Sequence, residues 1–191
     1  MRIIAGSKRR LQLKTVEGND TRPTADRIKE TLFNMIQNEV PGCYFLDLFA
    51  GSGQIGLEAV SRGAKFAVLA EHAKKAADCI RYNIQFTKSE KECLLLQMDV
   101  IAALRSLEGK YRFDIVFLDP PYSSGLDQNA LAYLKDSALL AEDALLILET
   151  ARGTDTAWIA DAGFTVIKEK TYKTNAHLFL KKDGNIPGGE D

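Results

Sequence analysis

The chain has 191 residues, of which 46% are hydrophobic and 27% are charged, and its formal net charge at pH 7 is −1. This length suits a single α/β domain with a small appendage, and the composition excludes a disordered, fibrous or membrane-spanning chain. The first residues lack the apolar stretch of a signal peptide, so we expect a cytoplasmic protein that does not bind membranes.

The cysteines and histidines do not form the pattern of a metal site. Cys43, Cys79 and Cys93 lie 36 and 14 residues apart, and His72 and His177 stand alone. We therefore expect the cysteines to be reduced packing residues and the protein to hold no metal.

Basic residues gather in two short segments although the whole chain is nearly neutral. Residues 1–14 carry five lysines and arginines and no acid, and residues 168–182 carry five lysines against Glu169 alone. Clusters of this kind can bind nucleic-acid phosphates, although two solvated surface edges are the alternative interpretation.

The first 40 residues have the pattern of an N-terminal extension formed by a hairpin and a helix. Residues 2–5 and 11–15 lie on either side of a polar turn at residues 6–8, which predicts a β-hairpin. A helix should follow, with Thr24 as its N-cap and the Pro-Gly pair at residues 41–42 as its end. The apolar residues of this helix at helical spacing are Ile28, Leu32, Phe33 and Ile36.

From residue 43 onward, apolar runs alternate with helical patterns, which predicts a parallel sheet covered by helices on both faces. The predicted strands are residues 43–48, 66–70, 93–98, 113–118 and 144–149. The predicted helices are residues 54–62, 73–86, 99–107 and 127–138. Two last runs, 164–172 and 177–182, predict a terminal hairpin that makes the sheet mixed. We therefore expect a main domain over residues 41–182 and a disordered tail over residues 183–191.

A glycine-rich segment follows the first of these strands. Gly51, Gly53 and Gly56 have the spacing GxGxxG, and Glu71 lies 20 residues after Gly51, at the end of the next strand. Glycines in this context let a nucleotide approach the backbone closely. The fingerprint fits both NAD and S-adenosylmethionine, so taken alone it leaves the ligand open.

Acidic residues follow three successive predicted strands. Asp47 ends the strand before the glycines, where a carboxylate suits the cationic methionine end of S-adenosylmethionine better than a pyrophosphate. Glu71 can accept two ribose hydroxyls, and Asp99 can accept from an adenine amino group. Helix capping and solvated loops are the alternative roles, above all for Asp99.

The tetrapeptide Asp119-Pro120-Pro121-Tyr122 follows the fourth strand and decides between the two ligands. Two prolines remove two backbone donors, so Asp119 and the Pro120 carbonyl form a rigid array of acceptors. An exocyclic amino group is a matching donor, and Tyr122 offers a face on which a base can stack. Taken alone, the tetrapeptide could also be a turn that ends the strand with an aromatic plug.

These motifs resemble the RsmD family of 16S rRNA guanine-N2 methyltransferases. The resemblance rests on residues 21–34 (TRPTADRIKETLFN), residues 46–64 (LDLFAGSGQIGLEAVSRGA), Glu71 and residues 117–122 (FLDPPY). It implies a Rossmann-like class I S-adenosylmethionine-dependent fold, with a seven-stranded, mostly parallel sheet, an antiparallel last strand, and an N-terminal hairpin and helix. It also implies methylation of N2 of one guanine, position 966 in the rRNA convention, within the small ribosomal subunit or its assembly intermediate.

The resemblance further implies the residues of the site. The cofactor contacts are Asp47, Phe49, Gly51, Ser52, Gly53, Glu71, His72, Asp99 and Val100. The target-amine site is Asp119, Pro120, Pro121 and Tyr122. The RNA contacts are Arg9, Arg10, Arg22 and Thr24, and residues 22–24 also close over the site. S-adenosylhomocysteine is the implied product.

Three other functions stay open at this point. A DNA adenine-N6 methyltransferase shares the Asp-Pro-Pro-Tyr chemistry, but such enzymes usually carry a target-recognition domain for which 191 residues leave no room. An NAD-dependent oxidoreductase fits the glycine fingerprint but has no use for that tetrapeptide. A non-catalytic RNA-binding module would keep the basic segments without turnover.

Overall fold

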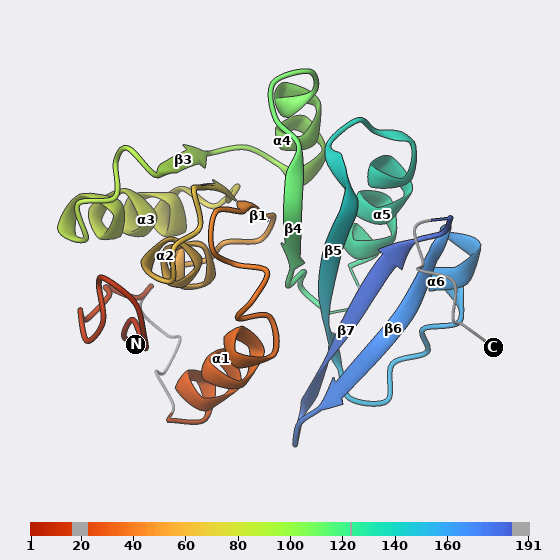
Figure 1. The fold of residues 1–191 in the computed structure, drawn as a ribbon, viewed down its shortest axis with the longest axis horizontal. Helices are drawn as coiled ribbons and strands as arrows, with labels where there is room; N and C mark the ends of the chain where they lie inside the picture. The colour runs from red at the N-terminus through yellow and green to blue at the C-terminus, as the bar shows by residue number, and fades with distance from the viewer. Residues whose placement is uncertain (17–22, 123, 185–191) are drawn as a thin grey trace.

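The computed structural model describes residues 1–16, 23–122 and 124–184, which contain one seven-stranded sheet (Figure 1). The strands are β1 (Tyr44–Asp47), β2 (Phe66–Ala70), β3 (Cys93–Leu96), β4 (Phe113–Leu118), β5 (Leu140–Ala151), β6 (Phe164–Thr171) and β7 (Asn175–Lys182). Their order in the sheet is β3-β2-β1-β4-β5-β7-β6, and β7 runs antiparallel to both of its neighbours. The predicted mixed sheet with an antiparallel last strand is confirmed.

Helices cover both faces of this sheet, as the alternation in the sequence predicts. They are α1 (Pro23–Met35), α2 (Gln54–Ser61), α3 (Lys74–Phe86), α4 (Val100–Leu107), α5 (Leu126–Asp136) and α6 (Trp158–Asp161). Successive side chains of a strand point to opposite faces, so each inner strand contributes side chains to two hydrophobic cores. In β1, Phe45 packs in the core that includes residues of α1, α2 and α3, whereas Leu46 packs in the core that includes residues of α4 and α5.

The chain changes direction across the sheet at β1 and β4. Strands β2 and β3 lie on one side of β1, and β4 and β5 lie on the other. In open α/β sheets, ligands bind in the crevice at the carboxyl ends of two such strands. Asp47 ends β1 and Asp119 directly follows β4, so the topology brings both carboxylates to this crevice.

The N-terminal segment, residues 1–16, forms the predicted hairpin, although its two arms are not regular strands. One isolated bridge between Arg2 and Gln12 takes the place of the predicted strands at residues 2–5 and 11–15. The two arms still pair as the hairpin predicts, because Ile3 N–H donates to Leu11 O at 3.0 Å and Leu13 N–H donates to Met1 O at 3.0 Å. The backbone between the arms bonds to α2 instead.

The contact between this segment and α2 is very close (Figure 1). The N–H groups of Ile4 and Ala5 donate to the Glu58 carboxylate at 2.8 and 3.1 Å. Gly6 has a φ of +83°, and a Cβ atom there would lie 1.7 Å from the backbone oxygen of Ser61. Glycine is therefore required at position 6 both by its conformation and by the space available.

Helix α1 begins at Pro23, so Thr24 lies in its first turn and not at the predicted N-cap. Proline suits this position because the first helical residues need no N–H donor. The predicted boundary between the extension and the main domain, at residues 40–41, remains a prediction, and most of the predicted tail lies outside the described residues. Within the described parts of the chain, none of the helices is long and apolar enough to cross a bilayer.

Candidate active site

Asp47 is buried in the crevice, with 1% of its surface exposed. Its Oδ2 accepts a hydrogen bond of 3.2 Å from Gly56 N–H, while its Oδ1 has no hydrogen-bond partner among the described residues. Burial raises the pKa of this carboxyl to about 7, and the negative charge of Glu71 contributes to the increase. A buried acceptor without a partner fits a ligand that brings a hydrogen-bond donor or a positive charge.

Two glycines of the loop between β1 and α2 have positive φ angles. Gly51 at +55° and Gly53 at +79° lie in the left-handed region that favours glycine. A Cβ atom on Gly51 would meet no described atom within 4 Å, whereas one on Gly53 would lie 3.0 Å from Leu69 Cδ2. Gly51 therefore borders open space in which a ligand could lie, and Gly53 lets the loop pack against the sheet.

Glu71, just after β2, is bonded to the same loop. Its Oε2 accepts from Gly51 N–H at 3.0 Å, and its Oε1 accepts from Ala73 N–H at 2.7 Å. His72 Nδ1 lies 3.5 Å from Oε1, and the His72 side chain is largely exposed. Each carboxylate oxygen has two lone pairs, so Glu71 keeps acceptor capacity for a ligand.

A cavity of about 200 Å³ lies beside Glu71. It gathers five of the nine predicted cofactor contacts, namely Phe49, Glu71, His72, Asp99 and Val100. Its other lining residues, which the sequence did not point to, are Leu48, Ala70, Met98, Ile101 and Leu126. The cavity therefore combines an apolar wall with carboxylates at its rim, which suits a planar heterocycle and its polar edge.

Two predicted cofactor contacts, Asp99 and Ser52, also form hydrogen bonds within the protein. Asp99 is the N-cap of α4, because one of its carboxylate oxygens accepts from Ala102 N–H at 2.9 Å. Its alternative role as a helix cap is thus present together with a place at the cavity wall. Ser52 does not line the cavity: its carbonyl accepts from Asn83 Nδ2 at 2.9 Å, and its Oγ lies 3.8 Å from Met1 Sδ.

The Asp-Pro-Pro-Tyr segment follows β4. Pro120 is buried, whereas Asp119 is exposed and Tyr122 is 54% exposed. The protein around the Asp119 carboxyl still restricts its hydration and raises its pKa to about 8, with the negative charges of Glu149 and Asp47 contributing. An acidic group with a raised pKa in a crevice, beside an exposed aromatic ring, is typical of a functional site.

Sequence reasoning missed Glu149, near the carboxyl end of β5. Asn175 Nδ2 donates to its Oε1 at 2.6 Å, and His177 Nε2 lies 3.0 Å from its Oε2. Antiparallel pairing of β5 with β7 places His177 directly opposite Glu149. The rule that identified Asp47 and Asp119, an acid where a strand ends, could have identified this residue too.

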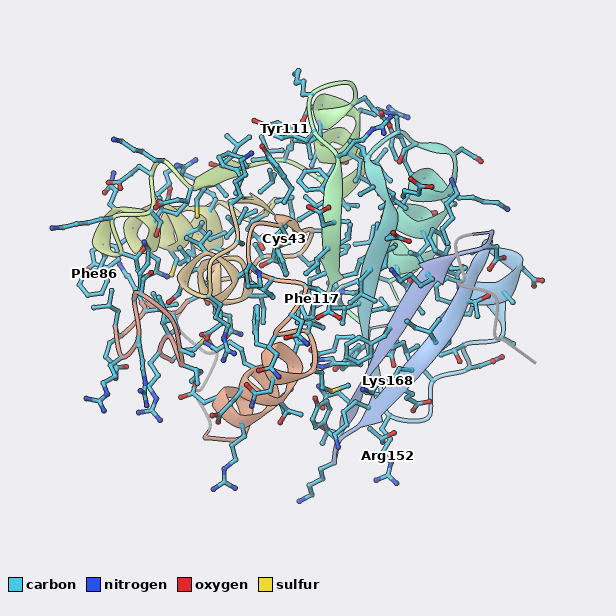
Figure 2. The ribbon with its side chains drawn as sticks, in the orientation of Figure 1. Cys43, Phe86, Tyr111, Phe117, Arg152 and Lys168 are labelled. Atoms are coloured by element: carbon cyan, nitrogen blue, oxygen red, sulfur yellow. The ribbon has the colours of Figure 1, made fainter. Side chains whose placement is uncertain are left out.

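His177, which stands alone in the sequence, is buried in the structure. Its ring contacts Phe117 and Tyr172 edge to face, with centroid distances of 6.0 and 5.1 Å. The Tyr172 hydroxyl lies 3.4 Å from Nδ1. Figure 2 shows Phe117 near the centre of the molecule, between the sheet and α1. The histidine therefore has a polar partner at each ring nitrogen and two aromatic neighbours.

The predicted RNA contacts are only partly described. Arg9 and Arg10 are exposed on the N-terminal segment. Arg22 and the side chain of Thr24 lie outside what the structure describes.

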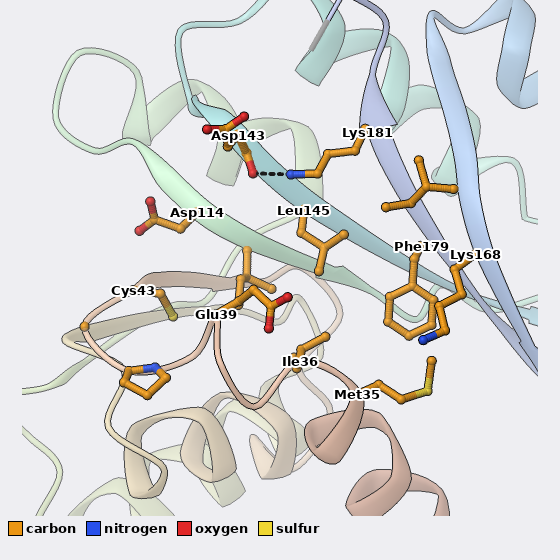
Figure 3. Close-up of a pocket in the computed structure, with 14 residues that line it drawn as sticks. Met35, Ile36, Glu39, Cys43, Asp114, Asp143, Leu145, Lys168, Phe179 and Lys181 are labelled. Atoms are coloured by element: carbon orange, nitrogen blue, oxygen red, sulfur yellow. Dashed lines mark hydrogen bonds between the residues drawn. The ribbon is translucent and has the colours of Figure 1, made fainter. Parts of the chain in front are cut away.

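The lysines of the second basic segment, residues 168–182, are spread along the β6–β7 hairpin. Lys173 lies in the turn between β6 and β7, whereas Lys181 lies near the other end of β7 and donates to Asp143 O. Lys168 and Lys181 both line a cavity of about 470 Å³ away from the crevice (Figure 3). None of the residues predicted for the site lines this cavity.

Comparison with known proteins gives close agreement over nearly the whole chain. Residues 1–181 match the family model described as Conserved hypothetical protein 95. The chain is 37% identical to Ribosomal RNA small subunit methyltransferase D of Haemophilus influenzae, over 90% of this chain and 88% of that protein. It is 34% identical to the Putative rRNA methyltransferase YlbH of Bacillus subtilis, over 96% of this chain and 100% of that protein.

The fold is also shared with solved structures. The Putative methyltransferase yhhF from Escherichia coli matches with a TM-score of 0.80 and 30% sequence identity, over 95% of this chain and 97% of that one. A putative methylase from Haemophilus influenzae matches with a TM-score of 0.78 and 32% identity, over 95% and 97% of the two chains. The chain therefore has the class I methyltransferase fold and belongs to the RsmD family, as its motifs indicated.

Proposed function

We propose that this protein transfers a methyl group from S-adenosylmethionine to the exocyclic N2 of one guanine in 16S rRNA. The observation that carries the proposal is the meeting of two acceptor groups at one crevice: the unpartnered Oδ1 of Asp47 and the Asp119 carboxylate. The names of the relatives support rRNA of the small subunit as the substrate class. The small ribosomal subunit, or its assembly intermediate, is then the partner in the cytoplasm.

The donor side of the crevice suits S-adenosylmethionine, which when bound supplies a methyl group on a positively charged sulfur and leaves as S-adenosylhomocysteine. Asp47 would accept from the cationic methionine end, because its Oδ1 is buried and unpartnered. Glu71 would accept from the ribose hydroxyls. Phe49, Asp99 and Val100 would contact the adenine in the cavity beside Glu71.

The acceptor side would orient the target amine. Asp119 and the Pro120 carbonyl take its two N–H groups, which turns the nitrogen lone pair away from the ring and toward the methyl carbon. That lone pair forms the new bond while the carbon–sulfur electron pair remains on sulfur. The nitrogen then loses one proton, which passes to Asp119 and on to water. Tyr122 offers the face on which the base stacks.

The raised pKa values of Asp47 and Asp119 are consistent with a cationic donor. A positive charge beside these two carboxyls lowers their pKa values, so the ionised forms that accept hydrogen bonds dominate once the donor is bound. The protein thus positions the donor and the target amine and provides negative charge beside the sulfonium, whereas the reactivity comes from the donor itself.

The basic N-terminal segment would position the RNA. Arg9 and Arg10 are exposed there and can contact phosphates, which fix the orientation of a nucleic acid without reading its sequence. In this proposal residues 22–24, including Arg22 and Thr24, close over the crevice once donor and RNA are bound.

The test is methyl transfer by the purified full chain to small ribosomal subunits from cells that lack this protein. The RNA is digested afterwards and its methylated nucleosides are identified. We expect one new N2-methylguanine. N6-methyladenine formed in DNA would support the DNA enzyme instead, and binding of NAD in place of S-adenosylmethionine in calorimetry would support an oxidoreductase. Binding of the subunit without transfer would support a non-catalytic module.

A further inference from the structure

The inner part of the crevice is lined by hydrogen-bond acceptors. A cavity of about 130 Å³ is bordered by the Asp119 and Glu149 carboxylates and by the side chains of Gln54 and Asn175. The Oε1 of Gln54 and the Oδ1 of Asn175 are buried and have no hydrogen-bond partner among the described residues. Such a wall fits a ligand edge that carries several N–H donors.

The cation at this cavity is already engaged. Lys29 lines it, but its Nζ donates to Arg2 O at 2.6 Å and lies 3.4 Å from Glu58 Oε2. A ligand that carries donors therefore fits the unpartnered oxygens of Gln54 and Asn175 better than a second acceptor would.

Both carboxylate oxygens of Glu149 have a side-chain partner. Asn175 donates to Oε1 at 2.6 Å, and His177 Nε2 donates to Oε2 at 3.0 Å, since an ionised carboxylate can only accept. His177 is in turn held by Tyr172 and Phe117. Each oxygen of Glu149 keeps a second lone pair for a ligand.

Glu149 also borders a second cavity, of about 470 Å³, which is lined by Pro120, Pro121 and Tyr122. The outer cavity offers an aromatic face and the inner one offers acceptors, and Glu149 is common to both. A base that stacks on Tyr122 would therefore direct one edge toward Glu149 and Asp119.

Guanine and adenine differ at the ring position beside the amino group. Guanine carries an N1–H donor next to its 2-amino group, whereas adenine has a bare N1 lone pair next to its 6-amino group. We propose that Glu149 selects guanine by accepting its N1–H while Asp119 accepts from the neighbouring amino group. An adenine would place its N1 lone pair against a carboxylate, which is repulsive. This inference rests on the proposed function and adds a specificity-determining residue to it.

The experiment compares guanine with 2-aminopurine, which keeps the 2-amino group but has a bare N1. The guanine that the wild-type protein methylates is located first, and small-subunit RNA is then prepared with either base at that position. Single-turnover methyl transfer is measured for the wild type and for Glu149→Gln. The matched control is Glu142→Gln, the same change at an exposed position of β5.

The wild type and Glu142→Gln should favour guanine over 2-aminopurine by about 10- to 100-fold. In Glu149→Gln this preference should disappear or reverse, because an amide can donate to a bare N1. S-adenosylmethionine affinity, measured by calorimetry, should remain within about twofold of the wild type, since Glu149 does not line the donor cavity.

A Glu149→Gln protein that keeps the wild-type preference would overturn the role of Glu149 and leave guanine methylation standing. A wild-type protein that methylates no guanine in the subunit would instead overturn the proposed function. If Glu149→Gln does not fold, Glu149→Asp provides the test. Its shorter side chain should slow transfer to guanine while leaving transfer to 2-aminopurine unchanged, and an equal loss for both bases would contradict the proposal.

Discussion

Lys29 of α1 and Glu58 of α2 form an ion pair with 2% and 0% of their side chains exposed and 3.4 Å between Nζ and Oε2. Glu58 also accepts from Arg62 Nε at 2.8 Å and from backbone N–H groups of the N-terminal segment. Burial lowers the pKa of Lys29, because its desolvation outweighs the attraction of Glu58 and Asp26. One buried pair therefore joins α1, α2 and the first residues of the chain.

Replacing one partner of this pair should destabilise the fold strongly. Glu58→Gln leaves Lys29 buried without its counter-charge, so we expect the free energy of unfolding in urea to fall by about 3–5 kcal/mol. Lys29→Met should cost less, because Glu58 keeps its ion pair with Arg62. Asp26→Asn is the control, because it removes the more exposed ion pair with Arg2 and should cost less than about 1 kcal/mol. If the free energy of unfolding falls by the same small amount in all three variants, the buried pair contributes no more than the exposed one.

The stability of the ligand-free protein should depend on pH through Asp47. Its pKa is about 7 in the folded protein against an ordinary value of 3.8, so the folded state binds the proton more tightly. The ionised carboxyl therefore destabilises the fold increasingly as the pH rises from about 4 through 7. The midpoint temperature of Asp47→Asn minus that of the wild type should therefore increase by roughly 3–6 °C between pH 5 and pH 8.

Thermal unfolding at several pH values measures this gain. Asp136→Asn, at an exposed position of α5, should show no such trend. A midpoint difference between Asp47→Asn and the wild type that shrinks as the pH rises would have the wrong sign for a buried carboxyl with a raised pKa.

Donor binding should release protons at neutral pH. The sulfonium charge of S-adenosylmethionine lowers the pKa values of Asp47 and Asp119 from about 7 and about 8, so part of the bound protons leave. Calorimetry at pH 7 in buffers with different ionisation heats counts them. S-adenosylhomocysteine, with a neutral sulfur, should release fewer protons, and Asp47→Asn should reduce the number for both ligands. Proton uptake with S-adenosylmethionine would contradict the assignment of these carboxyls.

Glu71 should be needed for binding the donor, whereas Asp119 should be needed for methyl transfer. Glu71→Ala removes the acceptor that also holds Gly51 N–H, so S-adenosylmethionine affinity should fall by about 10-fold or more. Asp119→Ala should abolish methyl transfer while leaving that affinity within a few-fold. Affinity by calorimetry and transfer under single-turnover conditions are the two measurements, and an equal loss of affinity in both variants would refute the division of roles.

The docking of the N-terminal segment on α2 should affect the affinity for RNA. In Gly6→Ala, the new Cβ would collide with the backbone of Ser61, so the segment must leave α2. We expect small-subunit RNA to bind about 10-fold more weakly at low salt, because Arg9 and Arg10 lose their fixed position. Gly109→Ala controls for backbone strain, since Gly109 also has a positive φ but open space around its Cβ position. RNA affinity that falls equally in both variants would exclude the collision as the cause.

Much of the fold and of the donor side could be predicted because both depend on local patterns. Alternating strands and helices placed Asp47 and Glu71 at the ends of β1 and β2, where the structure has them. Glu149 and His177 could not be paired in advance, because their contact follows from the antiparallel register of β5 with β7. The hairpin predicted around Gly6 is present, but its docking on α2 could not be predicted, since the acceptor for Ile4 N–H lies on a helix more than 50 residues away.

The bond between Ile4 and Glu58 joins residues 54 positions apart. During translation the amino-terminal arginines therefore emerge long before their anchor on α2 has been made. They can reach their final place only after β1 and α2 have folded. A nascent chain would thus place these arginines correctly only once the glycine loop between β1 and α2 has formed. The segment that is synthesised first is therefore among the last to dock.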